Sequence, residues 1–500
     1  MKYVISAEEM KLYDSRTMEH FGMPSCVLME RAALSVLDVI REKELKTEEV
    51  LIVCGSGNNG GDGMVLARLL FLAGSRVEVV MAGNPEHFSV EAKRQMGILE
   101  AYGIPVSDSI PEGETYDLIV DAIFGIGLSR PVKENYARLI DQMNQLKGFK
   151  LAVDIASGIS ANTGQVLGIA FRADLTVTFA FAKYGQLLDP GRELSGELIV
   201  KEIGITKESF LGDKPAGFYY EKKDISLVPA RKASSNKGSY GKVLSITGSP
   251  DMAGASYFAS KAASVTGAGL VYIHAAEENR IILQTLMPEA VLNSYAEDPL
   301  SGLEEELMRC NVIICGCGIG KSEKARKILS YVLQQGKSPL ILDADALNLL
   351  SEEKSLREAA KAYPKELVIT PHIGEASRLL GMDAASIKAD PIAAAERLAE
   401  ELDCICVLKD AVSLVKAKES DCFVNTSGCN AMSKGGSGDA LTGVIAGLMA
   451  QGMPAKEAAC LGVYLHGLAG EAAAEACGNY SMAPTDLIEG IKTILKEVSL

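Results

Sequence analysis

The feature that most limits how this chain can fold is a glycine-rich turn between a strand-like run and a helix near the C-terminus. The run Cys422 to Asn425 leads into Asn425 to Gly443, NTSGCNAMSKGGSGDALTG, where KGGSGD precedes a helix expected over Asp439 to Ala450. Glycine permits positive φ angles and lets a ligand approach the backbone closely. The free N–H groups and the dipole of a helix start favour an anion. We therefore predict a phosphate-binding turn in an α/β fold.

Asp439, at the start of this expected helix, has two interpretations. An Asp at a helix start is an ordinary cap. The same carboxylate could also take a proton from a hydroxyl group while the backbone amides hold a phosphoryl group. Three glycines are more than a cap requires, so the sequence favours the catalytic role.

Length and charge narrow the class of protein. Five hundred residues are too many for one hydrophobic core and predict two domains. The net charge of −15 argues against a protein that holds nucleic acid through its phosphates. Without the pattern of a signal peptide or a long apolar run, we expect a cytoplasmic protein with no membrane partner. The eleven cysteines contain no CxxC motif and are expected to be buried thiols.

The first half begins with a helical segment, residues 7–43, and then alternates strands with helices. The apolar run Val50 to Cys54 enters a glycine turn, Gly55 to Gly63, and a helical sequence follows. Strand, glycine turn and helix form the first unit of a doubly wound parallel sheet, and the turn matches GxGxxG. We therefore predict a Rossmann-like domain here.

The polar residues of this turn argue against ordinary dinucleotide binding. The next strand, Arg76 to Met81, does not end in the acidic residue that would hold a ribose. The turn carries Asn58, Asn59 and Asp62, which favours a polar pocket, although all three also suit a turn that has no ligand.

Two further strands of the first half end in a carboxylate. Asp121 follows an apolar strand and precedes a glycine loop, and Asp154 does the same ahead of Ser157-Gly158. Each could be only a helix cap. Together with Asn59 they favour a site, because hard oxygen ligands at converging strand ends suit a cation and leave one carboxylate for proton transfer. Lys183 could face the same crevice, but we expect it to extend toward solvent.

The second half starts after a segment of mixed charge, Asp213 to Asp224, where we place the domain boundary. The βα pattern then restarts and predicts a second α/β domain. His372, at a strand end, is a candidate ligand or a structural histidine. Lys409, at another strand end, could reach a phosphate, as could any lysine so placed.

The assembled motifs resemble one known pair of domains. GNNGGDG, DAIFGIGLSRP and DIASG in the first half resemble the NAD(P)H-hydrate epimerase domain. NKGSYGKVL, DADALN, TPHIGE, VLKD and NAMSKGGSGDALTG in the second half resemble the ribokinase-like, ADP-dependent NAD(P)H-hydrate dehydratase domain. The resemblance implies an epimerase domain over residues 1–215 and a dehydratase domain over residues 222–500.

This resemblance implies a bifunctional isomerase and lyase for metabolite repair. The epimerase would interconvert the R and S forms of hydrated NADH and NADPH. The dehydratase would use ADP to restore the dihydronicotinamide from the S form and would release AMP and phosphate. Small-molecule substrates, a potassium ion, a magnesium ion and ADP are the implied ligands, and we expect a homo-oligomer.

Residue roles follow from the same resemblance, motif by motif. Asp154 and Asp439 would be the catalytic groups of the two domains, both touching the substrate. The other hydrate contacts would be Asn58, Asn59, Gly60, Gly61, Asp62, Gly125, Ile126, Gly127, Leu128, Ser129, Arg130 and Pro131 in the first domain and Ala255, Gly318 and His372 in the second. The nucleotide would contact Lys409, Asp410, Ala411, Val412, Ser413 and Gly438, and potassium would be held by Asn59, Asp121 and Ser157.

The sequence departs from the family pattern in four places. Ala156 and Ile373 replace common prolines, which changes rigidity but not chemistry. Asp410 replaces a glycine and is followed by Ser413 in place of threonine, so a carboxylate is expected near a nucleotide phosphate.

Two alternatives remain at this stage. The C-terminal anion site would also suit a vitamin or sugar kinase, which would accumulate a stable phosphorylated product. The first domain could be a silent nucleotide-sensing module, although Asn59, Asp121 and Asp154 argue for a working site.

Overall fold

The structure, a computed structural model, describes residues 1–498 and divides into two compact units. One unit is Lys2–Gly217, and the other starts at Phe218 and also contains Met1. The division falls within the mixed-charge segment 213–224. Strands and helices alternate in both units, so the predicted α/β class is confirmed.

The N-terminal unit contains a seven-stranded sheet in the order β4-β3-β2-β5-β6-β7-β9. All neighbouring pairs in this sheet are parallel. The strands are β2 (Glu49–Cys54), β3 (Arg76–Met81), β4 (Val106–Ser107), β5 (Leu118–Ala122), β6 (Phe149–Val153), β7 (Leu175–Phe179) and β9 (Glu197–Lys201). The chain order reverses direction between β2 and β5, and a doubly wound sheet binds its ligand at this switch point.

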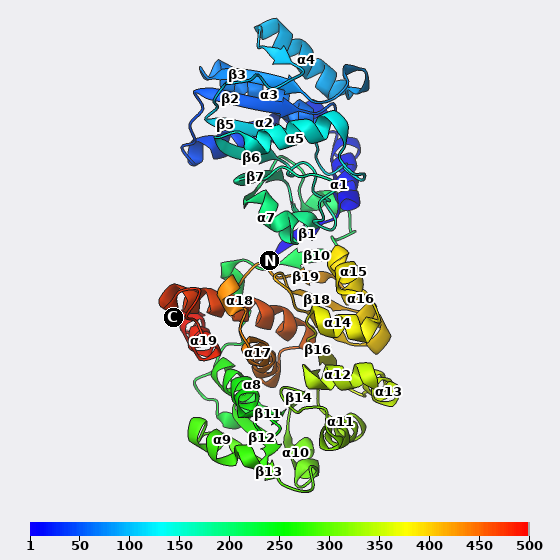
Figure 1. The fold of residues 1–500 in the computed structure, drawn as a ribbon, viewed down its shortest axis with the longest axis vertical. Helices are drawn as coiled ribbons and strands as arrows, with labels where there is room; N and C mark the ends of the chain where they lie inside the picture. The colour runs from blue at the N-terminus through cyan, green and yellow to red at the C-terminus, as the bar shows by residue number, and fades with distance from the viewer. Residues whose placement is uncertain (499–500) are drawn as a thin grey trace. The chain divides into compact units, whose positions relative to one another are not determined.

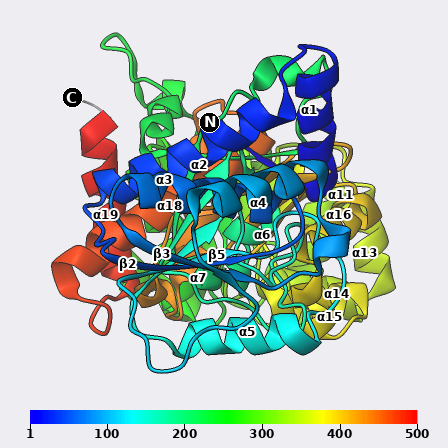
Figure 2. The same ribbon diagram turned by 90° about the horizontal axis from the view of Figure 1, so that it is seen from above.

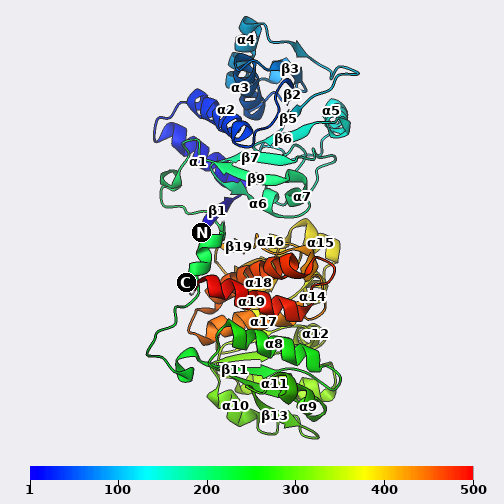
Figure 3. The same cartoon turned by 90° about the vertical axis from the view of Figure 1, so that its left-hand side faces the viewer.

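Helices cover both faces of this sheet. The longer helices are α1 (Ala7–Glu19), α2 (Ser25–Glu42), α3 (Asn58–Leu72), α4 (Val90–Tyr102) and α5 (Glu134–Gln145). Figures 2 and 3 show α2, α3 and α4 on one face and α5 on the other. Val50 and Ile52 of β2 pack in the core under α2 and α3, whereas Leu51 and Val53 pack in the core under α5. The strand is therefore apolar throughout, as its sequence indicated.

Shorter elements complete the N-terminal unit. They are β1 (Lys2–Ile5), β8 (Ala182–Lys183), α6 (Tyr184–Leu187), α7 (Gly191–Ser195) and the 3-10 turns Pro85–His87 and Lys207–Phe210. β1 pairs in parallel with β8. The expected helical segment 7–43 is two helices, because Gly22 adopts a positive φ of 70° and Pro24 caps α2.

The sheet of the C-terminal unit runs in the order β13-β12-β11-β14-β15-β16-β17-β18-β19-β10. Neighbours are parallel from β13 to β17, whereas β18 is antiparallel to both β17 and β19. The strands are β10 (Gly217–Tyr219), β11 (Lys242–Ile246), β12 (Leu270–Ala276), β13 (Val291–Tyr295), β14 (Val312–Cys315), β15 (Leu340–Leu342), β16 (Leu367–Ile369), β17 (Ile405–Leu408), β18 (Leu414–Ala417) and β19 (Cys422–Val424).

Two groups of helices flank this sheet (Figure 1). One group is α8 (Ala253–Thr266), α9 (Arg280–Leu286), α17 (Ser437–Ala450), α18 (Ala455–Cys477) and α19 (Pro484–Val498), whose apolar side chains form one core. The others are α10 (Leu303–Arg309), α11 (Glu323–Gln335), α12 (Asp345–Glu352), α13 (Lys354–Lys361), α14 (Ile373–Leu380), α15 (Ala384–Ala389) and α16 (Pro391–Leu402). The 3-10 turns are Lys222–Leu227, Lys237–Tyr240, Glu277–Asn279 and Asn430–Met432.

Two element boundaries differ from the sequence prediction in ways that matter for function. α17 starts at Ser437, so Asp439 is its third residue and not its first. The sequence alone indicated a strand-like run over Ala411 to Val415. β18 instead starts at Leu414, because Leu414 pairs with Leu408 of β17, and Lys409 to Ser413 form a loop. In the part of the chain that the structure describes, no helix is long and apolar enough to cross a membrane.

Candidate active sites

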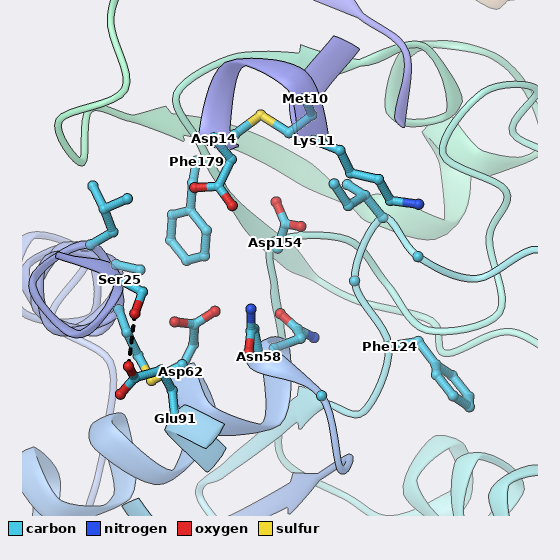
Figure 4. Close-up of a pocket in the computed structure, with 18 of the residues that line it drawn as sticks. Met10, Lys11, Asp14, Ser25, Asn58, Asp62, Glu91, Phe124, Asp154 and Phe179 are labelled. Atoms are coloured by element: carbon cyan, nitrogen blue, oxygen red, sulfur yellow. Dashed lines mark hydrogen bonds between the residues drawn. The ribbon is translucent and has the colours of Figure 1, made fainter. Parts of the chain in front are cut away.

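A cavity of about 770 Å³ opens at the switch point of the N-terminal sheet. Its walls come from α1, α2, the start of α3, the loop after β5 and the end of β6 (Figure 4). The residues that line it are Met10, Lys11, Asp14, Met18, Ser25, Leu28, Met29, Ala32, Ser56, Gly57, Asn58, Asn59, Asp62, Val90, Glu91, Ile123, Phe124, Gly125, Ile126, Gly127, Leu128, Ser129, Arg130, Asp154, Phe179, Ile203 and Ile205.

Asp154 is the most strongly constrained of these residues. It directly follows β6 and has a positive φ of 65°, an uncommon conformation for a residue with a side chain. Its Oδ1 accepts hydrogen bonds from Lys183 Nζ at 2.6 Å and from Thr178 Oγ1 at 3.1 Å. Its backbone oxygen accepts a hydrogen bond from Gln186 Nε2 at 2.6 Å. Backbone and side chain are therefore both fixed.

Two more carboxyl groups face the same cavity. Figure 4 shows Asp14 of α1 and Asp62 of α3 directed toward the space that Asp154 also faces. Burial raises the pKa of Asp62 well above its usual value, and the charges of Asp154 and Asp14 raise it further. Burial and the charge of Asp154 likewise raise the pKa of Asp14. These environments favour the protonated form of Asp62 and Asp14.

The predicted potassium ligands lie at the base of the switch point. Asp121 is fully buried at the end of β5, and burial raises its pKa to about 6. It accepts hydrogen bonds from the backbone N and the Oγ of Ser157, both at 2.7 Å. Asn59 is buried, yet neither its Oδ1 nor its Nδ2 has a hydrogen-bond partner among the described residues. Such an unpartnered buried amide is costly without a ligand.

The remaining predicted residues of this unit divide by position. Asn58, Asn59, Asp62, Asp154 and every residue from Gly125 to Arg130 line the cavity, whereas Gly60, Gly61 and Pro131 are not part of its wall. Gly60 has a packing role, because a Cβ there would lie 1.9 Å from the backbone oxygen of Gly55.

The sequence prediction missed part of this site. Asp14 was not singled out, because α1 gave only an amphipathic pattern with many charged residues. The expectation that Lys183 extends toward solvent was wrong. Its side chain is fully buried and forms an ion pair with Asp154. Its Nζ also donates a hydrogen bond to Thr178 Oγ1, five residues earlier in the chain.

In the C-terminal unit, the glycine turn leads into the N-terminus of α17. Gly436, the N-cap of α17, has a φ of 98°, and no side chain caps the helix. A Cβ on Gly438 would lie 3.3 Å from Lys409 Nζ, so glycine keeps this approach open. Ser437 Oγ is buried and has no hydrogen-bond partner in the part of the chain that the structure describes. His466 Nε2 lies 2.9 Å from the Ser437 backbone oxygen and supports the turn.

Asp439 lies in a buried network of charged and polar groups. Asp343, which follows β15, accepts hydrogen bonds from Lys409 Nζ at 2.8 Å and from Thr442 Oγ1 at 3.0 Å. Ligand atoms of Cys317, Asp343 and Asp439 all lie within 4.8 Å of one another. Burial raises the pKa of Asp439 to about 7, and the charge of Asp343 adds to this effect.

Lys409 partly balances these carboxylates. Burial lowers its pKa, but Asp343 and Glu375 outweigh that effect, so the pKa lies above its usual value. Asp343 was not predicted as a site residue, although its position at a strand end was the available signal.

His372 and Glu375 form the start of α14 next to this network. His372 Nδ1 accepts a hydrogen bond from the Gly374 backbone at 2.9 Å, and Glu375 Oε2 accepts one from the His372 backbone at 2.9 Å. His372 remains half exposed. Burial raises the pKa of Glu375 to about 7.

The other predicted contacts of this unit fall into two places. Gly318, with a φ of 61°, lies against Ala255, since a Cβ on Gly318 would be 2.8 Å from the Ala255 Cβ. Lys409 to Ser413 form the β17–β18 loop, in which Val412 is buried. Asp410 forms an ion pair with Lys388 of α15 at 3.4 Å, so its negative charge is partly neutralised.

Comparison with known proteins matches both units. Residues 25–185 match the family model described as YjeF-related protein N-terminus, and residues 243–493 match that described as NAD(P)H-hydrate dehydratase. A bifunctional NAD(P)H-hydrate repair enzyme from Moorella thermoacetica is 34% identical over 99% of this chain and 97% of its own length. The Escherichia coli repair enzyme is also 34% identical, over 98% of this chain and 93% of its own length.

Solved structures are similar to the C-terminal unit. A ribokinase-like superfamily protein from Enterococcus faecalis is 29% identical, with a TM-score of 0.52 over 57% of this chain and 97% of that protein. An ADP/ATP-dependent NAD(P)H-hydrate dehydratase from Bacillus subtilis, co-crystallised with ATP and Mg²⁺, is 28% identical, with a TM-score of 0.49 over 56% of this chain and 98% of that protein.

Proposed function

The chain belongs to the family of bifunctional NAD(P)H-hydrate repair enzymes, and from this premise we propose that it repairs hydrated NADH and NADPH at two separate sites. The N-terminal unit interconverts the R and S hydrates. The C-terminal unit removes water from the S hydrate with ADP as the phosphoryl donor, and it releases AMP and phosphate.

The epimerase site is the cavity that contains Asp154. The carbon that changes configuration carries a hydroxyl group, so the reaction needs proton transfer at that oxygen. Asp154 has the fixed geometry and the contact with the cavity that such a group requires. The loop from Gly125 to Arg130 and the start of α3 form the surface against which the hydrate lies.

Potassium fits the oxygen-rich pocket beneath this cavity. The amide oxygen of Asn59, the buried Asp121 carboxylate and the Ser157 hydroxyl are hard oxygen atoms, which suit such a cation. Potassium would offset the charge of Asp121 and would fix the loops that carry Asn59 and Ser157.

The dehydratase site is the glycine turn and the network around Asp439. Hydroxide is a poor leaving group, whereas phosphate departs readily once the hydroxyl oxygen has been phosphorylated. Asp439 takes the hydroxyl proton, and the backbone N–H groups of Gly438 and its neighbours hold the phosphoryl group. Lys409 offsets negative charge beside them.

ADP and magnesium fit this second site to different degrees. The uncapped start of α17 and the unpartnered Ser437 hydroxyl suit a nucleotide phosphate, and the loop from Lys409 to Ser413 would contact the nucleotide. The Cys317 thiol is a poor ligand for magnesium, so we expect magnesium to be held mainly through the phosphates. Magnesium would neutralise charge on the transferring group. Ala255, Gly318 and His372 would border the hydrate.

One observation carries this proposal: Asp439 is a carboxylate with a pKa near neutrality at the uncapped N-terminus of α17. A phosphate site without a base, or a base without a phosphate site, would not perform phosphoryl transfer to a hydroxyl group.

Product analysis separates dehydration from the kinase alternative. Purified protein is incubated with the S hydrate, ADP and Mg²⁺, and NADH, AMP and phosphate are quantified. We expect one AMP and one phosphate for each NADH formed. Accumulation of a stable phosphorylated hydrate would instead support a kinase. The oligomeric state and the cytoplasmic location remain predictions.

A further inference from the structure

Lys183 is a fully buried lysine that belongs to no predicted motif but points at the epimerase site. Its Nζ donates to Asp154 Oδ1 at 2.6 Å, to Thr178 Oγ1 at 2.7 Å and to the Phe179 backbone oxygen at 3.2 Å. An ammonium group has three donors, so all of its hydrogen bonds are used. A buried cation is stable only beside a compensating charge, and Asp154 supplies that charge. Lys183 therefore holds Asp154 in a buried ion pair.

The same contacts separate the two oxygen atoms of Asp154. Oδ1 accepts from both Lys183 and Thr178, whereas Oδ2 has no hydrogen-bond partner among the described residues. A Cβ placed on Gly125 would lie 3.2 Å from Oδ2, so Oδ2 points toward the glycine loop of the cavity wall. Oδ1 is therefore held by two hydrogen bonds, whereas Oδ2 is available to contact a substrate.

Asp62 differs from Asp154 in its hydrogen-bond and ion-pair partners. It lies in the cavity wall on α3 and has no hydrogen bond or ion pair with any described residue. Burial and the charges of Asp154 and Asp14 raise its pKa well above its usual value. Unlike Asp154, it forms no ion pair with a cation among the described residues, so its environment favours the protonated form.

We propose that Lys183 is a positioning residue that holds Asp154 as the proton acceptor through Oδ2, while Asp62 across the same cavity is the proton donor of epimerisation. This inference rests on the epimerase function proposed above. It assigns a chemical role to each of the two carboxyl groups.

The proposed step needs no reactant other than water. Asp62 gives its proton to the substrate hydroxyl, the C–O bond breaks with its electron pair leaving on water, and the ring nitrogen lone pair forms a C=N⁺ bond. A water molecule then adds to the opposite face of that carbon and gives one proton to Asp154. A proton passes back from Asp154 to Asp62 through water, and in the reverse reaction the two groups exchange roles.

The cavity wall holds other ionisable side chains besides Asp62 and Asp154. It contains the carboxyl groups of Asp14 and Glu91 and the cations Lys11 and Arg130. The ionisable groups that face the Asp62–Asp154 space or lie beside it are Lys11 and Asp14 of α1, Cys54 of β2, Glu91 of α4, Asp121 of β5, Arg130 of the loop after β5, and Lys183.

The test measures interconversion of the R and S hydrates by chromatography without nucleotide, so that dehydration is inactive, across pH 5 to 9. In Lys183→Met we expect the maximal rate to fall at least about 100-fold with little change in KM. The acidic limb of the rate profile should move to higher pH, because the cation that favours ionised Asp154 is gone. Thr178→Val should move it the same way by less.

Controls distinguish positioning from simple loss of folding. Lys201→Met removes a paired lysine on the neighbouring strand β9 and should leave both the rate and the profile unchanged. If thermal denaturation shows that Lys183→Met is not folded, the pH–rate profile of Thr178→Val tests the positioning role instead. Asp62→Asn should cost at least about 100-fold in maximal rate.

Three results would overturn the inference: a Lys183→Met rate within about threefold of wild type, a loss that is equal at every pH, or an Asp62→Asn variant with near wild-type rate. If the wild-type protein does not interconvert the epimers at all, the proposed epimerase function fails instead.

Discussion

The dehydratase rate should rise with pH through neutrality because Asp439 must be ionised to accept a proton. Burial raises the pKa of Asp439 to about 7, and Asp343 contributes to this rise. Below that pKa the carboxyl group already holds a proton and cannot act as a base. Loss of protons therefore activates the site, so the rate increases toward alkaline pH and then becomes constant.

The magnitude follows from this pKa. For a single group with a pKa of about 7, roughly 9% is ionised at pH 6 and roughly 91% at pH 8. The rate at limiting S hydrate should therefore increase about tenfold between these two values. A carboxylate at its usual pKa would give no change over this range.

Two variants identify the group that titrates. Asp343→Asn removes a negative charge that raises the pKa of Asp439, and it also releases Lys409 from its ion pair. Both changes lower the pKa of Asp439, so the increase of the dehydratase rate with pH should occur at lower pH. Glu375 has a pKa of about 7 as well and could produce the same curve. If the ionisation of Asp439 controls the dehydratase rate, the midpoint of the pH–rate curve of Glu375→Gln should stay near pH 7.

The assay follows the near-ultraviolet absorbance of reduced nicotinamide from pure S hydrate with saturating ADP and Mg²⁺. A control titration at each pH measures nucleotide affinity, so that a change in ADP binding is separated from a change in rate. A rate that is constant from pH 6 to pH 8 would refute the role of Asp439 as base, as would a midpoint that moves in Glu375→Gln but not in Asp343→Asn.

Three other predictions concern the N-terminal unit. Gly125→Ala places a Cβ 3.2 Å from Asp154 Oδ2 and 3.4 Å from Asn59 Cβ, so epimerisation should fall at least about tenfold with an unchanged melting temperature; an unchanged rate would contradict this geometry. Gly60→Ala places a Cβ 1.9 Å from the Gly55 oxygen and should destabilise the unit by about 1–3 kcal/mol or more in chemical denaturation, whereas wild-type stability would show that the loop can relax. Replacing potassium with tetramethylammonium should slow epimerisation, and Asn59→Ala should lose this response; a rate independent of potassium would exclude the proposed ion site.

The fold was largely predictable because both halves repeat a strong local pattern. An apolar run such as Val50 to Cys54 is typical of a buried parallel strand, and the glycine turn and helical sequence that follow it indicate the βα order. Boundaries were less accurate where tertiary pairing decides them. β18 begins at Leu414 because of its register with β17, which local sequence does not reveal.

The candidate sites were predictable where a residue ends a strand or lies in a glycine turn. Asp121, Asp154, Lys409 and Asp439 all have such positions. Contacts between distant segments carry no local signal.

Two residues illustrate these distant contacts. Lys183 is the second residue of the short strand β8, and only the folded chain brings its side chain to Asp154. Asp14 sits among many charged residues on α1, and nothing in that pattern distinguishes the carboxyl group that faces the cavity.

The central claim, two independent sites in one chain, is tested most directly by the amplitude of NADH recovery from a mixture of R and S hydrates. With ADP and Mg²⁺, the wild-type protein should restore all of the reduced-nicotinamide absorbance faster than the epimers interconvert unaided. Asp154→Asn should rapidly restore only the S fraction. Asp439→Asn should restore none while it still interconverts the epimers. Loss of both activities in either folded variant would contradict the account.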